Sequence, residues 1–556
     1  MKDLHMKLQR LHGKAFGTYN DLRGHAWEIG DFQWNWIHIQ GDPFAPPSRL
    51  RISASLAALG IPESWFSNPI RTQALADFLL RRLALCLGEH SQNLGTGNGG
   101  VLACAEPGPQ VLRRNSMRIE NGTLTALVQV GLPSDERRVV GEWVIQLLCQ
   151  SLPDALTEAL YSINIRAKEC EAHIHALELQ QALRATLPQL GLVAFVADGS
   201  VLPRASGSSN LPLRGARPFV SPLELRTEIE VLGEKIVGMG IPTGITAIAG
   251  GGFQGKSTLL RSLELAIYDH IPGDGRERVV CDPSAFKVRT EEGRQVIGSC
   301  IEPLVRRLPG GKETNRFTTT SASGSTSQAA NLVEAIGLGA QTILIDEDIS
   351  AVNFLIRDER MRQLVRSSHE PLIPLVDRIV ELKTQLKLNF VMVIGACGDY
   401  LRVADTVIVM EDWEPRVATL EAHEICAQEQ ASPAENWPKW PKDFRHSLED
   451  VRKKLRPGLR PATAVEKGIK VKVTPQKVQL GRLIADISRV PQIVCSEQLR
   501  SIGAAALALL QSDPALTLEE AVSKGSLHLS MTEGLDLAEA RPLELGATLL
   551  RMAEME

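Results

Sequence analysis

Aromatic residues are scarce in this chain: Phe, Trp and Tyr together make up 4% of its 556 residues. Hydrophobic cores must therefore be built mostly from aliphatic side chains. The chain has nine cysteines, but no two are spaced C-x-x-C and none stands with histidines at zinc-ligand spacing. This pattern gives no support to a zinc site or a CxxC redox motif, and it favours buried, reduced thiols.

Long hydrophobic runs are also missing. No window of about 18 apolar residues occurs, so we expect no membrane-spanning helix and no membrane partner. The first residues, MKDLHMKLQRLHGK, contain no apolar core of signal-peptide length. The net charge of -4 is too small to indicate a partner by itself. We therefore expect a soluble, cytoplasmic protein.

The chain is too long for one hydrophobic core, and changes of composition predict three domains. Residues 1–220 are a mixed α+β accessory region that ends in the Pro/Gly-rich stretch ASGSSNLPLRGARPFVSP. Residues 221–425 alternate between apolar runs and helical patterns. Residues 426–556 form a small α+β region, and 439–482 within it carry 13 Lys/Arg against 4 Asp/Glu.

The alternating pattern of the middle region predicts an α/β domain with a mainly parallel sheet covered by helices. Its short apolar runs, expected to be strands, are 245–249, 278–281, 342–345, 390–394 and 406–410.

A glycine-rich loop follows the first of these runs. Residues 250–257 fit the pattern G-x-x-x-x-G-K-[ST], between a predicted strand and an amphipathic helix, which is the context of a P-loop. Glycines allow backbone N–H groups to approach phosphate oxygens, and a helix N-terminus adds donors and partial positive charge. The predicted nucleotide-binding residues are Gly250, Gly251, Gly252, Phe253, Gln254, Gly255, Lys256, Ser257 and Thr258.

An acidic pair ends the strand TILID. Asp346 would hold Mg²⁺ together with the Ser257 hydroxyl, because Mg²⁺ prefers oxygen ligands. Glu347 would orient or deprotonate the attacking water, while Lys256 would bind the β- and γ-phosphates of ATP. The sequence therefore predicts ATP and Mg²⁺ as cofactors, with Lys256 and Glu347 as catalytic residues.

The segment ASGSTSQAANLVEAIGLGA resembles the signature sequence of ABC ATPases, 23 residues before Asp346. The resemblance implies that Ser323, Gly324 and Ser325 contact the γ-phosphate held by another nucleotide-binding unit. SAVN, residues 350–353, resembles the D-loop of those proteins. An N-capped helix with a Ser-rich entry is the alternative interpretation of the signature segment.

Longer blocks resemble the family of predicted ATPases of the ABC class. They include GMGIPTGITAIAGGGFQGKSTLL, HIPGDGRERVV, LPGGKETNRFTTTSASGSTSQAANL and ILIDEDISAVNFLIRDERM, with IQGDPFAPPSRLRI nearer the N-terminus and LIADISRVPQIVCSEQLRSIGAAA nearer the C-terminus. The resemblance implies a central ABC-like ATPase flanked by N-terminal and C-terminal domains, and a link to RNA binding.

Three features depart from conventional ABC proteins. Asp399 stands where a switch histidine is usual, Gln295 is a weak Q-loop candidate, and the signature lacks its second glycine and final glutamine. Slow hydrolysis is therefore expected.

Two basic segments are candidate nucleic-acid contacts, because binding to a phosphate backbone needs such a surface. They contain Arg452, Lys453, Lys454, Arg456 and Arg460, and Arg306, Arg307 and Lys312. Trp437, Trp440 and Phe444 could stack on bases, although a solvated linker explains the segment equally well.

The favoured hypothesis is an ATPase coupled to nucleic-acid binding, with RNA favoured. The alternative is a nucleotide-gated protein-interaction module. A single P-loop and a single signature cannot form the ATP sandwich of ABC proteins in one chain, so a homodimer is a further expectation.

Overall fold

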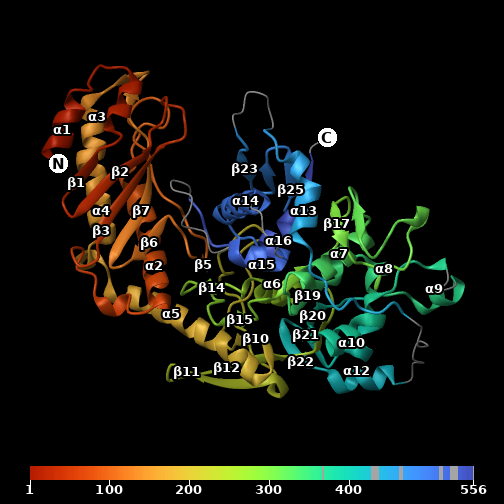
Figure 1. Cartoon of the computed structure of the whole chain (residues 1–556). Coiled ribbons are helices and arrows are strands. Elements are labelled where there is room, and N and C mark those ends of the chain that lie inside the picture. The colour runs from red at the N-terminus through yellow and green to blue at the C-terminus, as the bar shows by residue number, and fades with distance from the viewer. Residues whose placement is uncertain (366–368, 428–436, 462–467, 512–516, 526–535, 555–556) are drawn as a thin grey trace. The chain divides into compact units, whose positions relative to one another are not determined.

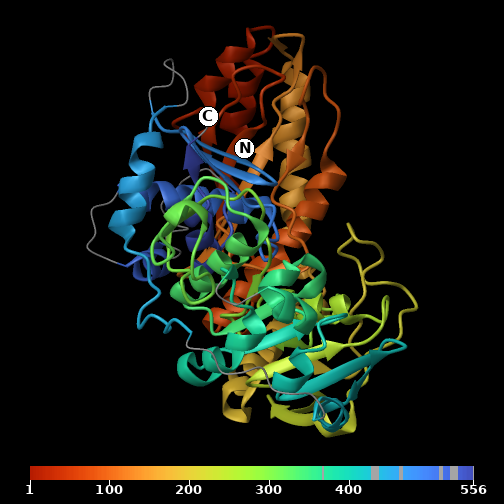
Figure 2. The same cartoon turned by 90° about the vertical axis from the view of Figure 1, so that its right-hand side faces the viewer.

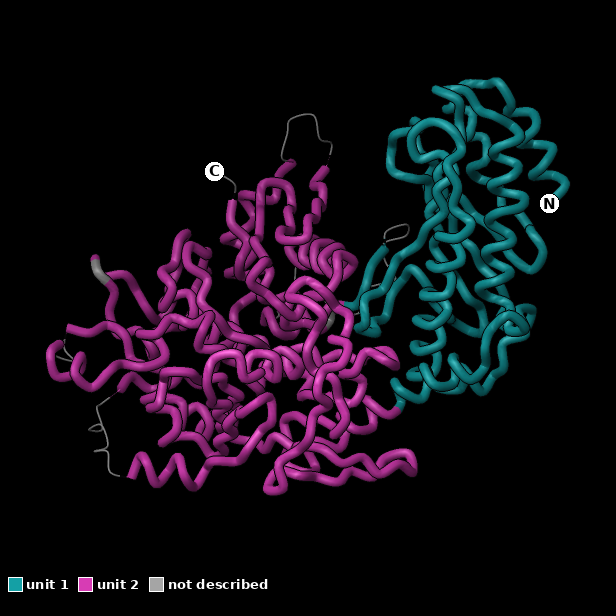
Figure 3. Tube along the Cα trace, turned by 180° about the vertical axis from the view of Figure 1, so that it is seen from behind, with its two compact units in different colours: residues 1–178, 529–539 teal, residues 179–528, 540–556 magenta. Residues whose placement is uncertain are grey.

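A computed structural model describes residues 1–365, 369–427, 437–461, 468–511, 517–525 and 536–554. The chain divides into two compact units (Figure 3): unit 1 comprises residues 1–178 and 529–539, and unit 2 comprises 179–528 and 540–556. The predicted domain boundaries at 220 and 425 stay a prediction.

Unit 1 is built on an antiparallel sheet with the strand order β1-β2-β3-β7-β4, in which β6 also pairs with β7. Strand β3 alternates buried and half-buried side chains, which is the period of two expected when one face packs on a core. The long helix α2 contacts β6 and the helix α4. Asn68 begins α2 by accepting a hydrogen bond from the Arg71 N–H.

The elements of unit 1 are α1 Lys2–Gln9, β1 Ala26–Ile29, β2 Phe32–His38, β3 Ser48–Ser55, α2 Pro69–His90, β4 Leu102–Ala103, β5 Gln110–Val111, β6 Met117–Glu120, β7 Thr123–Val130, β8 Ser134–Asp135, β9 Arg138–Val139, α3 Gly141–Gln146 and α4 Leu152–Leu160. Helix α5, Ala167–Thr186, runs from unit 1 into unit 2.

Unit 2 contains a six-stranded sheet in the order β16-β19-β20-β13-β21-β22 (Figure 1, Figure 2). The first five strands are parallel neighbours, and β22 returns antiparallel to β21. Helix α6 contacts β19 and β20, and helix α7 contacts β16. The expected mixed α/β fold is thus observed, with parallel pairing in this sheet and antiparallel pairing in the sheets around it.

Every apolar run expected to be a strand in this region forms one, but not all of them join one sheet. Strand β15, Val279–Cys281, pairs antiparallel with β10 in a separate sheet of order β11-β12-β10-β15. Instead, Phe286–Val288 forms β16 and pairs with β19. A three-residue strand carries too little pattern to specify its partner, so tertiary packing decides which sheet it enters.

The elements of unit 2 up to the end of the six-stranded sheet are β10 Leu192–Ala197, β11 Arg226–Val231, β12 Glu234–Pro242, β13 Ile245–Ala249, α6 Lys256–Leu265, β14 Asp269–His270, β15, β16, β17 Val296–Ser299, β18 Phe317–Thr319, α7 Gly324–Gly337, β19 Thr342–Asp346, α8 Val352–Leu355, α9 Glu359–Leu364, α10 Leu375–Leu386, β20 Asn389–Val393, α11 Tyr400–Val403, β21 Thr406–Glu411 and β22 Glu414–Val417.

The C-terminal part of unit 2 follows with α12 Thr419–Cys426, α13 Leu448–Leu455, β23 Val471–Thr474, β24 Lys477–Leu480, β25 Leu483–Asp486, α14 Ser496–Gln511, α15 Leu518–Gly525, α16 Pro542–Leu550 and β26 Ala553–Glu554. Strands β23 to β26 form an antiparallel sheet in chain order.

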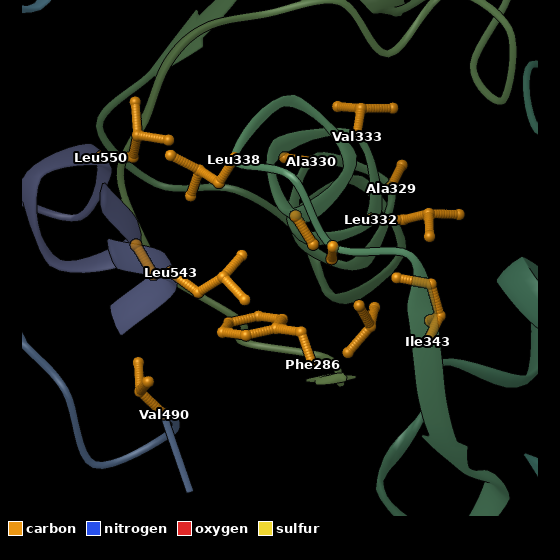
Figure 4. Close-up of a cluster of buried hydrophobic side chains, with 14 of the residues drawn as sticks. Phe286, Ala329, Ala330, Leu332, Val333, Leu338, Ile343, Val490, Leu543 and Leu550 are labelled. Carbon is orange, nitrogen blue, oxygen red and sulfur yellow. The ribbon is translucent and has the colours of Figure 1, made fainter. Parts of the chain in front are cut away.

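This C-terminal part shares a hydrophobic core with the six-stranded sheet. Figure 4 shows Leu543 and Leu550 of α16 beside Phe286 of β16 and Leu338 at the end of α7. A Cβ at Gly546 of α16 would come within 2.3 Å of a Leu338 methyl carbon, so any larger residue there would force the Leu338 side chain to move. Helix α7 is therefore covered at its C-terminal end by residues of α16 that lie more than 200 positions further along the chain.

None of the helices in the described ranges is both long and apolar enough to cross a membrane. No disulfide joins any of the nine cysteines, all of which lie in the described ranges, and six of them are buried.

Candidate active site

The glycine-rich loop joins β13 to α6 and needs its glycines at two positions. Gly250 and Gly255 have φ angles of 133° and 95°, in the region that favours glycine. A Cβ at Gly250 would also come within 2.5 Å of the Met410 carbonyl oxygen on β21. The loop is thus held against the neighbouring strand, while Phe253 at its tip is fully exposed.

Lys256 is the first residue of α6, and its ammonium turns back over the loop. The Nζ atom donates hydrogen bonds to the carbonyl oxygens of Gly250 at 2.5 Å and Gly251 at 2.6 Å. The lysine charge therefore lies beside the N-terminus of α6, where the partial charge of the helix is also positive. This concentration of positive charge is suited to a phosphate group.

Ser257 and Asp346 are brought together although they lie on different elements. Asp346 ends β19 with 5% of its surface exposed, and it accepts a hydrogen bond from the Ser257 hydroxyl at the start of α6. Burial raises the pKa of Asp346 above its ordinary value, against the opposing charge of Lys287 and the Ser257 hydrogen bond. A buried carboxylate beside a hydroxyl is a donor set that fits Mg²⁺.

Glu347, the next residue, is held by the loop that follows β20. Its carboxylate accepts hydrogen bonds from the backbone N–H groups of Gly395 at 2.6 Å, Ala396 at 3.0 Å and Cys397 at 3.2 Å. Burial acts to raise the pKa of Glu347, but these donors outweigh it and the pKa falls below its ordinary value.

The sheet aligns these groups at one edge. In the parallel register, Ile248 of β13 and Asp346 of β19 both pair with Val393 of β20. The P-loop after β13, the acidic pair after β19 and the loop 395–397 after β20 therefore leave the carboxyl ends of three adjacent strands. Ligands of open α/β sheets bind at such an edge.

The segment that resembles an ABC signature forms the N-capped start of α7, and its contacts with nucleotide stay a prediction. Ser323 caps α7 by accepting from the Thr326 N–H, and its side chain is exposed. Gly324 is half-buried, and Ser325 is buried with its hydroxyl donating to Asn353 Oδ1 at 2.6 Å. Of the three predicted signature contacts, Ser323 is the most accessible.

Helix α7 is also fixed to the segment 350–353. The Gln328 amide donates to the Ser350 hydroxyl at 2.9 Å and accepts from the Ala351 N–H at 2.7 Å. The Ser350 hydroxyl in turn donates to the Asp346 carbonyl oxygen at 2.8 Å. The signature helix is thus connected to the acidic pair through the segment that resembles a D-loop.

The sequence pointed to Gln295 as a Q-loop candidate and to Asp399 at the place of a switch histidine. Gln295 is buried and its amide donates to the Met552 carbonyl oxygen near the C-terminus, and its candidacy as a Q-loop residue stays a prediction. Asp399 is half-buried at the residue before α11, and its role stays a prediction.

The two basic segments lie close to each other. Arg316, at the end of the loop that carries Arg307 and Lys312, pairs with Asp450 of α13 at 3.1 Å. The exposed basic residues of the two segments are Arg307, Lys312, Lys453, Lys454, Arg456 and Arg460. Arg452 is half-buried and donates to the Leu510 carbonyl oxygen, and Arg306 is half-buried over the Trp437 ring.

The expectation that Trp440 could stack on bases is wrong. Trp440 is buried under the Arg378 guanidinium and donates to Glu381 at 3.0 Å. Phe444 packs against Trp440, with ring centroids 6.1 Å apart. These aromatic residues anchor the chain before α13, because they form a ring contact and a cation–π contact with side chains of the same unit.

Sequence reasoning missed several residues of the site. The backbone donors 395–397 carry no side-chain signal beyond the small residues of GAC. Gln328 and Asn353 are visible as polar residues near the two motifs, but their pairing depends on α7 packing beside the segment 350–353.

Comparison with known families identifies the domain that carries these residues. A family model for the P-loop domain of ABC ATPases matches residues 166–446, and a model for the N-terminal part of the ATPase of the ABC class matches residues 1–162. The chain belongs to the ATPases of the ABC class. The P-loop, the acidic pair and α7 of this ABC-class ATPase all lie inside the first match.

A curated relative of this ABC-class ATPase is an uncharacterised protein of Methanocaldococcus jannaschii, 32% identical over 252 residues. The match covers 43% of this chain and 55% of the relative, so the chain spans about half the length of that protein.

Solved structures also match the ABC-class ATPase, but weakly. CbiO1 of Clostridium perfringens, part of an ABC transporter complex, is 13% identical with a TM-score of 0.27, covering 48% of this chain and 96% of that one. An ATP-binding cassette of an ABC transporter in its ADP conformation is 12% identical with a TM-score of 0.23, covering 36% and 92%.

Proposed function

We propose that this ABC-class ATPase binds ATP together with Mg²⁺ in its P-loop and hydrolyses it. The observation that carries the proposal is the shared edge of β13, β20 and β19, whose strands are in register. Asp346 ends β19, Glu347 follows it, and Lys256 comes after the loop that leaves β13. The family match to a P-loop domain supports the same function.

Each residue has a distinct role in this proposal. Lys256 would exchange its two carbonyl acceptors for phosphate oxygens, and the N–H groups at the start of α6 would bind the same phosphates. Ser257 and Asp346 would hold Mg²⁺, which when bound neutralises charge on the β- and γ-phosphates. Glu347 would orient the attacking water and accept its proton, after giving up an N–H donor of the loop 395–397.

The test of binding is Lys256→Ala. Equilibrium titration with Mg-ATP should show binding to the wild-type protein and its loss in K256A. Lys235→Ala is the matched control, because Lys235 is an exposed lysine of the same unit that pairs with Glu228 at 2.8 Å on β11. Equal ATP affinity of K256A and wild type would refute the P-loop assignment.

We also propose that a second copy of the chain completes the site. Ser323 is exposed at the N-terminus of α7 while Ser325 and Gln328 behind it are buried, so this helix end is free to act on a nucleotide held by a partner. Analytical ultracentrifugation of Glu347→Gln with Mg-ATP should give a dimer, and Ser323→Glu should remove it. A monomer in both proteins would refute this arrangement.

We further propose that ATP hydrolysis is coupled to the binding of nucleic acid, with RNA the favoured partner. The proximity of the two basic segments supports this partner, because Arg316 and Asp450 join the segments and six of their basic side chains are exposed. On the nearby β23 and β24, Lys472 and Lys477 share the face opposite Val473, which packs towards α14. Such a surface should bind phosphate backbones with steep salt dependence.

Charge reversal tests this partner. Lys453→Glu with Lys454→Glu should abolish retention of single-stranded RNA at low salt and leave basal ATP turnover unchanged. Lys168→Glu with Lys235→Glu, two exposed lysines elsewhere, is the matched control for total charge. If the wild-type protein does not retain RNA at low salt, the nucleotide-gated protein-interaction module becomes the better account.

A further inference from the structure

The turn between β21 and β22 has an unusual residue at its tip. Glu411 pairs with Glu414, so Asp412 and Trp413 form a two-residue hairpin loop, and their φ angles are 48° and 66°. Two positive φ angles define the turn type in which Asn-Gly or Asp-Gly is strongly preferred. Asp412 fits this preference, but tryptophan occupies the position where glycine is favoured.

A bulky side chain with positive φ carries a cost in free energy that glycine would avoid. Burial does not offset this cost at Trp413, because 63% of its surface is exposed. Burial therefore does not account for a tryptophan at this position, and an aromatic ring largely exposed in a strained turn indicates a role in binding.

The turn is attached to the phosphate-binding loop. The Asp412 N–H donates to Gln254 Oε1 at 2.6 Å, and a Cβ at Gly255 would come within 3.3 Å of Trp413 Cδ1. On its other side the hairpin is held by Arg217, which pairs with Glu414 at 2.5 Å. The indole edge thus lies beside the P-loop backbone, one residue before Lys256.

We infer that Trp413 is the platform on which the base of the bound nucleotide stacks. This inference rests on the proposed binding of ATP and specifies how the site recognises the base. A triphosphate in the P-loop has its nucleoside attached at one end, and Trp413 is an exposed aromatic face fixed beside that loop. Stacking removes two flat faces from water and favours the larger ring system of a purine nucleoside triphosphate.

The experiment compares Mg-ATP with inorganic triphosphate, which has the phosphates but lacks the base. Calorimetric titration of Trp413→Ala should show ATP affinity lowered by about tenfold to a hundredfold, since an alanine substitution removes the stacking. The affinity for inorganic triphosphate should stay that of the wild type. Trp413→Phe should restore most of the ATP affinity, because a phenyl ring also offers a stacking face.

Trp413→Gly separates recognition from folding. Glycine suits the positive φ angle, so this variant should melt at or above the wild-type temperature while its ATP affinity falls as in W413A. Leu420→Ala is the matched control, because Leu420 is a large apolar side chain of the same unit that is 79% exposed.

The outcomes separate the two proposals. Wild-type protein that binds ATP, with W413A or W413G binding it equally well, would overturn the base platform alone. Loss of inorganic triphosphate together with ATP in W413G would also overturn it, because the ring would then serve the phosphate site. Wild-type protein that binds neither ligand would refute ATP binding itself and the platform with it.

Discussion

The carboxylate of Glu347 accepts a hydrogen bond from the Gly395 N–H at 2.6 Å, which joins the ends of the adjacent strands β19 and β20. Ala396 and Cys397 add two further donors to the same carboxylate. The candidate base of the reaction is therefore already oriented by backbone groups, and any water that it positions has to compete with these donors.

Glu347→Gln should bind Mg-ATP with unchanged affinity and lose hydrolysis by about a hundredfold to ten-thousandfold, the range for removal of a general base. The amide keeps the shape of the side chain but cannot take a proton from water. Equilibrium titration with Mg-ATP checks the predicted affinity, and single-turnover measurement of phosphate release checks the predicted loss of hydrolysis. Hydrolysis at the wild-type rate would show that another group positions the water.

Gly255→Ala should lower the melting temperature of the protein. The residue has a φ angle of 95°, and a Cβ there would press on Trp413 Cδ1 at 3.3 Å, so we expect a cost of about 1–2 kcal/mol from the left-handed backbone alone. Differential scanning calorimetry of the variant and the wild type without nucleotide measures the change in melting temperature.

Gly252→Ala is the control for Gly255→Ala. Gly252 lies on the same loop, but a Cβ there would have no neighbour within 4 Å. We expect its melting temperature to match that of the wild type. Equal melting of both variants would contradict the backbone geometry assigned to the loop.

Gln328→Ala should loosen the segment 350–353 from α7. The variant removes both hydrogen bonds of the Gln328 amide to this segment, leaving the Ala351 N–H without its acceptor at a cost of about 1–3 kcal/mol. Urea unfolding should report this loss, and ATP turnover should fall because Ser350 also bonds to Asp346.

Gln363→Ala is the matched control for Gln328→Ala. Gln363 is exposed and bonds only within its own helix, to Glu359 at 3.2 Å. We expect a change in the free energy of unfolding within about 0.5 kcal/mol, the usual range at the surface. A comparable loss in both variants would argue against a special role for Gln328.

Stability should fall at acid pH because of a buried carboxylate behind α7. Burial acts to raise the pKa of Glu291, but Arg551, Arg294 and Asn331 outweigh it, so the folded pKa lies below the ordinary value of 4.5. Glu334 also faces this cluster by pairing with Arg294. A lowered folded pKa contributes stability above pH 4.5, and that stability is lost as pH falls through the folded pKa.

Glu291→Gln tests this linkage. At pH 7 the variant should be less stable by about 3–5 kcal/mol, because it leaves Arg551 buried without its anion. In urea unfolding, the difference in stability between the variant and the wild type should narrow as pH falls below about 4.5 and through the folded pKa. Glu302→Gln, at an exposed carboxylate, should show no such narrowing. A gap that stays constant with pH would show that Glu291 does not titrate differently on folding.

The sequence by itself determined the local parts of this protein. The run ITAIA before GGGFQGKS and the run TILID before Glu347 specify strands, a loop and a helix, because glycine, β-branched residues and caps act over a few neighbouring positions. The family blocks predicted the central ATPase for the same reason, since each block is a contiguous motif.

Only the tertiary structure decided how distant segments meet. It placed β15 in a separate sheet and brought the Gln295 amide to the Met552 carbonyl oxygen. It also buried Trp440 under the Arg378 guanidinium and placed Trp413 beside Gly255. These contacts join residues that lie far apart along the chain, and their energy comes from burial and pairing that no short window of sequence records. The local pattern fixed which groups are present, and packing determined which of them the site can use.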